Sequence, residues 1–282
     1  MKTYRLCALL LGLLIPAAQA APLDEIALRQ QARLGGRIGL AVLDTASGEV
    51  LAVNGAQQFL MMSTFKTLAC ATLLAEADAG RLRLDAPVVI RQAELVTYSP
   101  VTEKFVGKPF TLQQACEATM LTSDNSAANL VLQGIGGPAA VTRFVRGLGD
   151  EVTRLDRLEP DLNSALMDDP RDTSSPVAMV RTLQTLIFGD ALKPDSRAQL
   201  KQWMQANQVA GSLFRSVLPA GWSIADRTGA GGNGSRGITA ILWPKDRAPL
   251  VVSVYLTQTG ADLNALNRSI AEIGREIFAL YP

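Results

Sequence analysis

The sequence predicts an α/β protein in which an antiparallel sheet flanked by helices adjoins an all-helical lobe. Strand-like segments occur near both ends of the chain and helical segments fill its middle. The 282 residues are 48% apolar and 19% charged, which supplies enough apolar material for a packed core. We therefore expect residues 21–56 and 208–282 to form one discontinuous α/β domain, and residues 57–207 an all-helical domain.

The first 20 residues predict an export signal that is removed. Lys2 and Arg5 form a short basic region before an apolar run, Leu6–Ile15, and Ala18–Ala20 reads as an A-x-A cleavage site. The run is too short to span a bilayer as a helix, and residue 21 is alanine rather than a lipoprotein cysteine. We expect cleavage near Ala20 and a periplasmic or secreted product without a membrane anchor.

The apolar pattern predicts the elements in chain order. A strand at 37–43 turns at 45–48 and returns at 49–53. A helix at 63–79 ends at Gly80, and Thr111 caps a helix that runs through residue 120. Further helices are expected at 127–132, 138–148, 176–188 and 196–207, strands at 223–226, 237–243 and 250–257, and an amphipathic helix at 261–280. The strands are expected to share one sheet covered by terminal helices, with the binding cleft between the two lobes.

The charge balance and the absence of histidine exclude several classes of function. Lys+Arg is 27 and Asp+Glu is 26, and no basic run occurs, so a nucleic-acid partner is not expected. The chain has no histidine, which excludes Ser-His-Asp and Cys-His catalysis and every His-ligated metal site. We expect no metal and no cofactor, and chemistry that uses Ser, Lys, Glu, Asp, Arg or Tyr.

Two cysteines remain after removal of the export signal. Cys7 leaves with the signal, so Cys70 and Cys116 form an even pair in an oxidising compartment. This setting favours a disulfide, and two buried free thiols are the alternative.

Four short motifs contain the side chains that could do this chemistry. Ser63 and Lys66 lie three residues apart in a predicted helix, so they share a face, and an adjacent amine can activate an alcohol without histidine. By itself this pattern also fits a helix cap followed by an exposed lysine. The other three motifs are Ser123-Asp124-Asn125 between two helices, Glu159 to Asn163 in a long irregular stretch, and Arg227-Thr228-Gly229 at the end of a strand.

Together the motifs resemble the ordered set S-x-x-K, S-D-N, E-x-x-x-N and K-T-G of the class A serine β-lactamases. The resemblance implies a β-lactamase/transpeptidase-like fold, a small-molecule β-lactam substrate, antibiotic resistance and a monomer. Arg227 stands where most members have lysine, which resembles the carbenicillin-hydrolysing subgroup, as do the stretches 95–100 and 217–222. The implied activity is hydrolysis of the β-lactam amide of penicillins, including carboxypenicillins.

The resemblance also implies a role for each motif residue. Ser63 would be the acylated nucleophile, Lys66 a proton acceptor or relay, and Ser123 the donor to the departing lactam nitrogen. Glu159 would activate the deacylating water, and whether it or Lys66 serves as the acylation base stays open. The implied substrate-binding residues are Tyr98, Asn125, Asn163, Arg227, Thr228, Gly229, Ala230 and Arg236, with the backbone N–H groups of Ser63 and Ala230 as the oxyanion hole. A simple packing role is the alternative for Tyr98.

The stretch 157–172 is expected to be an Ω-loop. By resemblance, an Arg157–Asp172 ion pair would close its neck and the Glu159–Pro160 peptide bond would be cis.

Two other functions share part of this motif set. A penicillin-binding D-alanyl-D-alanine peptidase has the nucleophile, S-x-N and K-T-G motifs, and a β-lactam sensor would remain acylated. Glu159 and Asn163 favour a hydrolase over both, because a carboxylate that activates water allows the acyl adduct to turn over.

Overall fold

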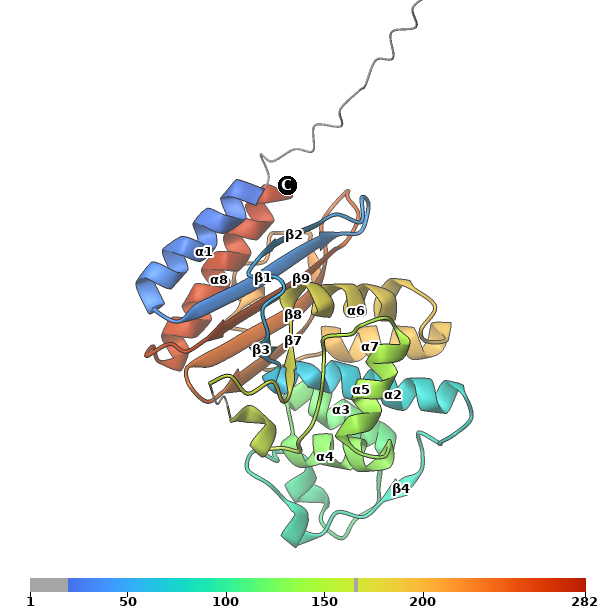
Figure 1. Ribbon diagram of the computed structural model, residues 1–282. Coiled ribbons are helices and arrows are strands. Elements are labelled where there is room, and N and C mark those ends of the chain that lie inside the picture. The colour runs from blue at the N-terminus through green and yellow to red at the C-terminus, as the bar shows by residue number, and fades with distance from the viewer. Residues whose placement is uncertain (1–19, 165–166) are drawn as a thin grey trace, which may run out of the picture.

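The centre of the protein is a five-stranded antiparallel sheet with strand order β2-β1-β9-β8-β7, seen in the computed structural model of Figure 1. The structure describes residues 20–164 and 167–282, so the export signal predicted for residues 1–20 lies, apart from Ala20, outside the described residues. The strands are β1 (Arg37–Asp44), β2 (Val50–Val53), β7 (Ser223–Gly231), β8 (Ser235–Trp243) and β9 (Leu250–Thr257). As expected, the N-terminal hairpin and the C-terminal strands share one sheet, joined where β1 pairs with β9 from Arg37↔Thr257 to Asp44↔Leu250.

Two terminal helices cover one face of this sheet. Figure 1 shows α1 (Ala20–Leu34) and α8 (Leu263–Leu280) side by side across the strands, and each packs on the sheet. Because side chains alternate along a strand, Ile38, Leu40 and Val42 of β1 join the core under these helices. Ala41 and Leu43 belong instead to the core on the opposite face, so both faces of the sheet are buried.

The opposite face packs on the helical part of the chain. Helix α6 (Pro176–Phe188) lies directly on β1 and β9, and α2 (Phe65–Asp78) is surrounded by other helices. Every residue of α2 from Phe65 to Leu74 is buried, as is typical of a central helix. The remaining helices are α3 (Leu112–Thr122), α4 (Asn125–Gly134), α5 (Pro138–Gly147) and α7 (Pro194–Gln205). The division of the chain into two domains remains a prediction.

Short elements complete the chain. The two-residue strands are β3 (Phe59–Leu60) paired with β6 (Thr173–Ser174), and β4 (Pro87–Val88) paired with β5 (Phe110–Thr111). The 3-10 turns are η1 (Met62–Thr64), η2 (Gln92–Glu94), η3 (Thr102–Phe105), η4 (Asp161–Asn163) and η5 (Phe214–Val217). Within the described ranges, no helix combines the length and apolarity that a membrane crossing requires.

Two expectations about where the motif segments lie relative to helix and strand ends were wrong. Arg227-Thr228-Gly229 does not end a strand, because β7 continues to Gly231 with Gly229 opposite Gly237 and Gly231 opposite Ser235. Glycine disfavours an isolated strand, but here the pairing with β8 overrides that preference. Ser63 does not open the α-helix either. It lies in η1, two residues before the first residue of α2, so the helix begins closer to Lys66 than the sequence indicated.

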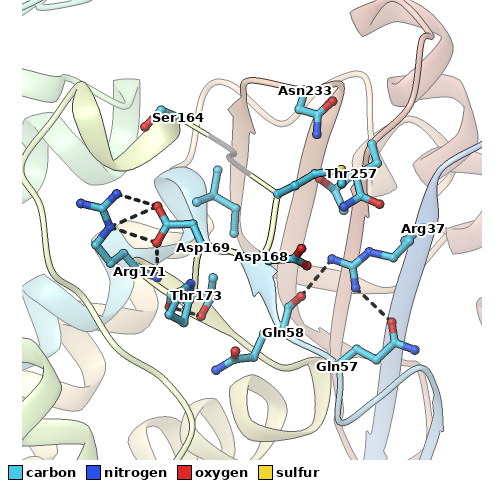
Figure 2. A pocket seen from close by; sticks show the side chains of 14 residues that line it. Arg37, Gln57, Gln58, Ser164, Asp168, Asp169, Arg171, Thr173, Asn233 and Thr257 are labelled. Atoms are coloured by element: carbon cyan, nitrogen blue, oxygen red, sulfur yellow. Dashed lines mark hydrogen bonds and ion pairs between the residues drawn. The ribbon is translucent and has the colours of Figure 1, made fainter.

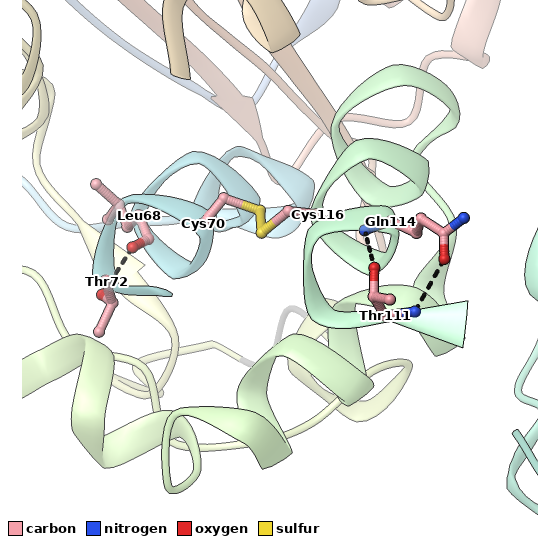
Figure 3. The surroundings of a disulfide bond; sticks show 6 residues. All are labelled: Leu68, Cys70, Thr72, Thr111, Gln114 and Cys116. Carbon is pink, nitrogen blue, oxygen red and sulfur yellow. Dashed lines mark hydrogen bonds between the residues drawn. A yellow bond between two sulfur atoms is a disulfide. The ribbon is translucent and has the colours of Figure 1, made fainter. Parts of the chain in front are cut away.

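The disulfide expectation is confirmed. Cys70 of α2 and Cys116 of α3 are bonded, with their Cα atoms 5.7 Å apart and both residues fully buried (Figure 3). Figure 3 also shows the expected cap at the start of α3, where Thr111 Oγ1 accepts from the Gln114 backbone and the Gln114 side chain accepts from the Thr111 backbone. The bond therefore ties the helix that contains Lys66 to the helix that leads to Ser123.

Removing this bond is expected to destabilise the protein without altering its sheet. The double variant Cys70→Ala/Cys116→Ala opens a loop with a sequence separation of 46 residues. The chain-entropy model gives a loss of about 4 kcal/mol at most in the free energy of unfolding. Urea unfolding of oxidised parent and variant checks this, with the reduced parent as the control. A variant as stable as the oxidised parent would contradict it.

Candidate active site

Lys66 is the point at which three segments of the site meet. Its side chain is fully buried, and its Nζ donates to Ser123 O at 2.9 Å, Ser123 Oγ at 3.2 Å and Asn125 Oδ1 at 2.6 Å. The same Nζ lies 3.1 Å from Glu159 Oε1, whose side chain is also fully buried. Helix α2, the α3–α4 turn and the irregular stretch around Glu159 are thus held together by one ammonium group.

Ser63 joins this cluster through Ser123. The Ser123 hydroxyl donates to Ser63 Oγ at 3.2 Å, so a continuous path of polar atoms runs from Ser63 through Ser123 to Lys66. Ser123 is the residue after α3 and has a positive φ of 67°, a conformation that non-glycine residues seldom adopt. The left-handed geometry turns both its carbonyl and its hydroxyl toward Lys66.

The buried carboxylate of Asp124 fixes the turn that carries Ser123 and Asn125. It caps α4 by accepting from Ala127 N at 2.8 Å, and it also accepts from Val101 N at 2.9 Å and Thr102 N at 2.8 Å. These bonds join the α3–α4 turn to the neighbouring loop. Asn125 is held in the same way, since its side-chain nitrogen donates to Thr97 O at 2.9 Å and leaves its oxygen for Lys66.

Glu159 is held by its backbone as well as by its side chain. Its bond to Pro160 is cis, as expected, and the Asn163 side-chain nitrogen donates to Glu159 Oε2. The sequence interpretation missed Asn129, whose amide accepts from Glu159 N at 2.9 Å and donates to Glu159 O at 2.9 Å. Asn129 follows Asn125 by four residues on α4, so helical periodicity places both on one face and could have indicated it.

The expected ion pair closes the neck of the loop that carries Glu159. Arg157 Nε lies 2.5 Å from Asp172 Oδ2, and the buried Asp172 also accepts from Asp156 N at 2.7 Å and Arg157 N at 2.9 Å. Because Asp172 bonds to the backbone on the opposite side of the neck, it fixes where the loop starts. Residues 165–166 of this loop lie outside the described part of the chain.

Strand β7 runs directly against the turn that carries Ser63. A Cβ atom on Gly229 would lie 2.7 Å from Met62 Cβ and 2.8 Å from Ser63 N, which is too close for any side chain. Farther along, Gly232 N donates to Asn163 O at 2.9 Å, so the end of this strand also meets the Glu159 loop. Glycine at 229 is therefore required for close approach of the strand, and Ala230 beyond it is exposed.

Two buried arginines lie on β7 and β8. Arg227 is fully buried, and its Nη1 donates to Asn207 Oδ1 at 3.4 Å, while its Nε and Nη2 are buried without a hydrogen-bond partner among the described residues. Arg236 Nη1 donates to Gly229 O at 2.9 Å and its Nε to Asn267 Oδ1 at 2.8 Å. Burial lowers the pKa of each arginine to about 10, so both remain cations at neutral pH.

The other expected binding residues differ in exposure. Thr228 is buried next to Arg227, whereas Tyr98 is 53% exposed and has a positive φ of 66°. The Tyr98 carbonyl accepts from Asn125 N at 2.9 Å, which links its loop to the motif turn. Asn207 and Asn267 were missed, since a single asparagine in a sequence carries no sign of the arginine it contacts.

Two cavities adjoin the loop that carries Glu159. The cavity of Figure 2, about 600 Å³, is lined in part by Arg37, Asp169, Arg171 and Thr257. It includes none of Ser63, Lys66, Ser123 and Glu159. A second cavity of about 680 Å³ is lined by a mixture of apolar and polar residues that includes Leu158, Glu159 and Asn129.

Burial tunes the amine at the centre of the site. It lowers the pKa of Lys66 to about 8, an effect that the carboxylate of Glu159 opposes and the cation of Arg227 reinforces. A lysine with this pKa exchanges its proton near neutral pH, which an ordinary surface lysine does not. The arrangement can therefore activate Ser63 and relay a proton through Ser123.

Comparison with known proteins agrees with this geometry. The model of the "Beta-lactamase enzyme family" matches residues 21–281. The chain belongs to this β-lactamase family. It is 54% identical to the β-lactamase CARB-3 and 53% identical to PSE-4, both of Pseudomonas aeruginosa, over 88% of this chain and 86% of each relative. Among solved structures, the chromosome-encoded β-lactamase of Vibrio parahaemolyticus has a TM-score of 0.90 at 51% identity, covering 92% of this chain and 98% of the other.

The family assignment confirms the activity and fold that the motifs indicated. The protein is a class A serine β-lactamase of the CARB/PSE type, and it hydrolyses β-lactams. An ancestral class A β-lactamase structure matches with a TM-score of 0.90 at 50% identity, over 92% of this chain and all of the other. The family match begins at residue 21, directly after the predicted cleavage site, in agreement with an export signal upstream.

The lowered pKa of Lys66 can be measured directly. We expect the Lys66 side-chain NMR signal to titrate with a midpoint near 8 rather than at the ordinary 10.5. In Glu159→Gln the midpoint should fall further, because the negative charge that favours the protonated amine is gone. Lys66→Arg identifies the signal by its disappearance. A midpoint near 10.5 in the parent would contradict the expectation.

Proposed function

We propose that this β-lactamase hydrolyses penicillins, including carboxypenicillins, through an acyl-enzyme on Ser63. The observation that carries the proposal is the polar path from Ser63 through Ser123 to the buried Lys66–Glu159 pair. It supplies a nucleophile, a proton relay and a carboxylate within one cluster, which is what acyl transfer followed by hydrolysis requires.

In the proposed acylation step Ser63 Oγ attacks the lactam carbonyl and gives up its proton. Lys66, with a pKa lowered to about 8 by burial, or Glu159 acting through a water, receives that proton. The Ser123 hydroxyl then protonates the lactam nitrogen as the amide bond breaks, and the proton taken from Ser63 returns to Ser123 through Lys66 Nζ, which donates to Ser123 Oγ at 3.2 Å. The hydrogen bond that Ser123 donates to Ser63 Oγ at 3.2 Å supports this role, because the leaving nitrogen departs from the carbon that Ser63 attacks.

In the proposed deacylation step Glu159 and Asn163 hold and activate water. Glu159 Oε1 and Asn163 Oδ1 are both buried. The first lies 3.1 Å from Lys66 Nζ, and no described residue donates a hydrogen bond to the second. Buried acceptors of this kind are normally satisfied by protein or by water. Glu159 as base then distinguishes turnover from the stable acylation of a sensor or peptidase.

The proposed binding residues lie on β7, on β8 and on the segments next to Ser123. Arg227, Thr228 and Arg236 would bind the carboxylate that all penicillins carry, and Arg227 has two unpartnered donor nitrogens for it. The backbone N–H groups of Ser63 and Ala230 would stabilise the oxyanion, which the close approach of Gly229 to Ser63 supports. Asn125 and Tyr98 would contact the amide side chain of the substrate. We further propose a monomer in the periplasm or the medium.

Glu159→Gln should acylate and then stall. Ser63 and the Lys66 amine remain, but the base for water is gone, so one equivalent of penicillin is consumed in a burst. Intact-protein mass spectrometry after mixing with benzylpenicillin should show one covalent adduct that persists. Steady turnover close to the parent rate would assign water activation to another group.

Ser63→Ala is the matched control for this adduct. It removes the nucleophile and leaves the pocket in place, so neither an adduct nor turnover is expected. A covalent adduct on Ser63→Ala would contradict the proposed nucleophile.

Arg227→Lys should distinguish two penicillins. Both side chains can bind the shared carboxylate, so benzylpenicillin hydrolysis should survive the substitution. Carbenicillin carries a second carboxylate. The charged guanidinium of Arg227, with several hydrogen-bond donors in one plane, should favour binding of this second group. We expect kcat/KM for carbenicillin to fall about 10-fold more than for benzylpenicillin. Equal losses for the two substrates, measured at one ionic strength, would mean that Arg227 serves the shared carboxylate alone.

A further inference from the structure

Arg227 is anchored at one nitrogen and unpartnered at the other two. Its Nη1 donates to Asn207 Oδ1, whereas its Nε and Nη2 are buried and no described residue accepts from them. Leaving a buried charged donor unsatisfied is costly, so such donors are expected to have a partner in the working state of a protein. The side chain is therefore arranged to receive an anion that the chain itself does not supply.

The anchor is a single asparagine whose orientation is chemically determined. Asn207 lies just beyond α7, and its Oδ1 also accepts from Val209 N at 3.1 Å, while its Nδ2 donates to Asp226 Oδ1 at 2.9 Å. A backbone N–H can only donate and a carboxylate paired with arginine can only accept. The amide oxygen of Asn207 must therefore face Arg227, and the amide nitrogen must face Asp226.

Asn207 contacts both Arg227 and the buried carboxylate of Asp226. Asp226 is fully buried, and Arg215 binds both of its oxygens, with Nε at 3.0 Å from Oδ2 and Nη2 at 3.0 Å from Oδ1. The Asp226 charge is thus neutralised by Arg215. Asn207 gives Arg227 a neutral acceptor, and no described carboxylate forms an ion pair with Arg227, so the cation at 227 stays available.

We propose that Asn207 is a positioning residue for substrate recognition, which holds Arg227 by Nη1 while leaving its charge, Nε and Nη2 to the substrate carboxylate. This rests on the proposed function, because it requires Arg227 to bind that carboxylate. Asn207 itself touches neither the substrate nor the reacting atoms. Its effect is on capture of the anionic substrate and not on hydrolysis of the acyl-enzyme.

Asn207→Ala removes the hydrogen bond to Arg227. The proposal is tested by whether this substitution affects kcat/KM and kcat differently. We expect kcat/KM for benzylpenicillin to fall about 10-fold, the effect of losing a hydrogen bond to a charged group, while kcat changes less than about 2-fold. Arg215→Lys is the matched control, because it disturbs the same buried network at Asp226 and leaves the Asn207–Arg227 contact. It should lower the melting temperature but change kcat/KM less than about 3-fold.

A double-mutant cycle decides whether Asn207 acts through Arg227. In an Arg227→Lys background, Asn207→Ala should cost less than about 3-fold in kcat/KM, since the contact is already altered. The same loss in both backgrounds, or a fall in kcat that matches the fall in kcat/KM, would overturn the proposal. If Asn207→Ala does not fold, Asn207→Ser takes its place, because it keeps a polar group for Asp226 and withdraws the oxygen from Arg227.

Benzylpenicillin hydrolysis by the parent and by Arg227→Lys alone is measured first. Absence of hydrolysis in the parent would overturn the proposed function itself. If the parent hydrolyses benzylpenicillin but Asn207→Ala lowers kcat/KM equally in both backgrounds, only the role of Asn207 would be overturned.

Discussion

The candidate active site depends on one buried ion pair, between Lys66 and Glu159. Burying two ionised side chains is costly unless they pair closely and neighbouring groups supply further hydrogen bonds. Here the ammonium group is bound by Ser123 and Asn125, and the Glu159 backbone is bound on both sides by Asn129. Three segments distant in sequence are thereby fixed around Ser63, and burial in the same place lowers the pKa of Lys66 into the range where it can exchange a proton.

The rest of the fold holds those segments in position. The Cys70–Cys116 bond joins the helix of Lys66 to the helix that ends at Ser123, and the Arg157–Asp172 pair closes the loop of Glu159. Strand β7 reaches Ser63 because Gly229 has no side chain to clash with the η1 turn. The contacts that stabilise the fold therefore also position the proposed catalytic side chains. The α2–α3 disulfide, the Arg157–Asp172 ion pair and strand β7 each fix one of the segments that meet at Ser63.

Much of this could be predicted from the sequence, for identifiable reasons. The pattern of apolar residues predicted strand 250–257 and helix 176–188 with their observed bounds. Both segments are long and apolar, and residues typical of turns and caps mark their ends. The motif residues were selected because their order is characteristic, and their roles remain predictions. Asn207 and Asn267 were not selected, because each contacts an arginine that lies far away in the sequence. Asn129 was overlooked, although its spacing of four residues from Asn125 on α4 could have indicated it. The glycine-rich end of β7 was also misjudged, since its strand conformation comes from pairing with β8 and not from local preference.

A double-mutant cycle on the free energy of unfolding tests the central claim most directly. Lys66→Met, Glu159→Gln and the double variant are compared with the parent by urea unfolding at pH 7. If the buried pair organises the site, each single variant leaves an uncompensated group, and the double variant should be about 1–3 kcal/mol more stable than the sum of the single effects predicts. Single effects that add to within about 0.5 kcal/mol would contradict the account, since the two groups would then be energetically independent.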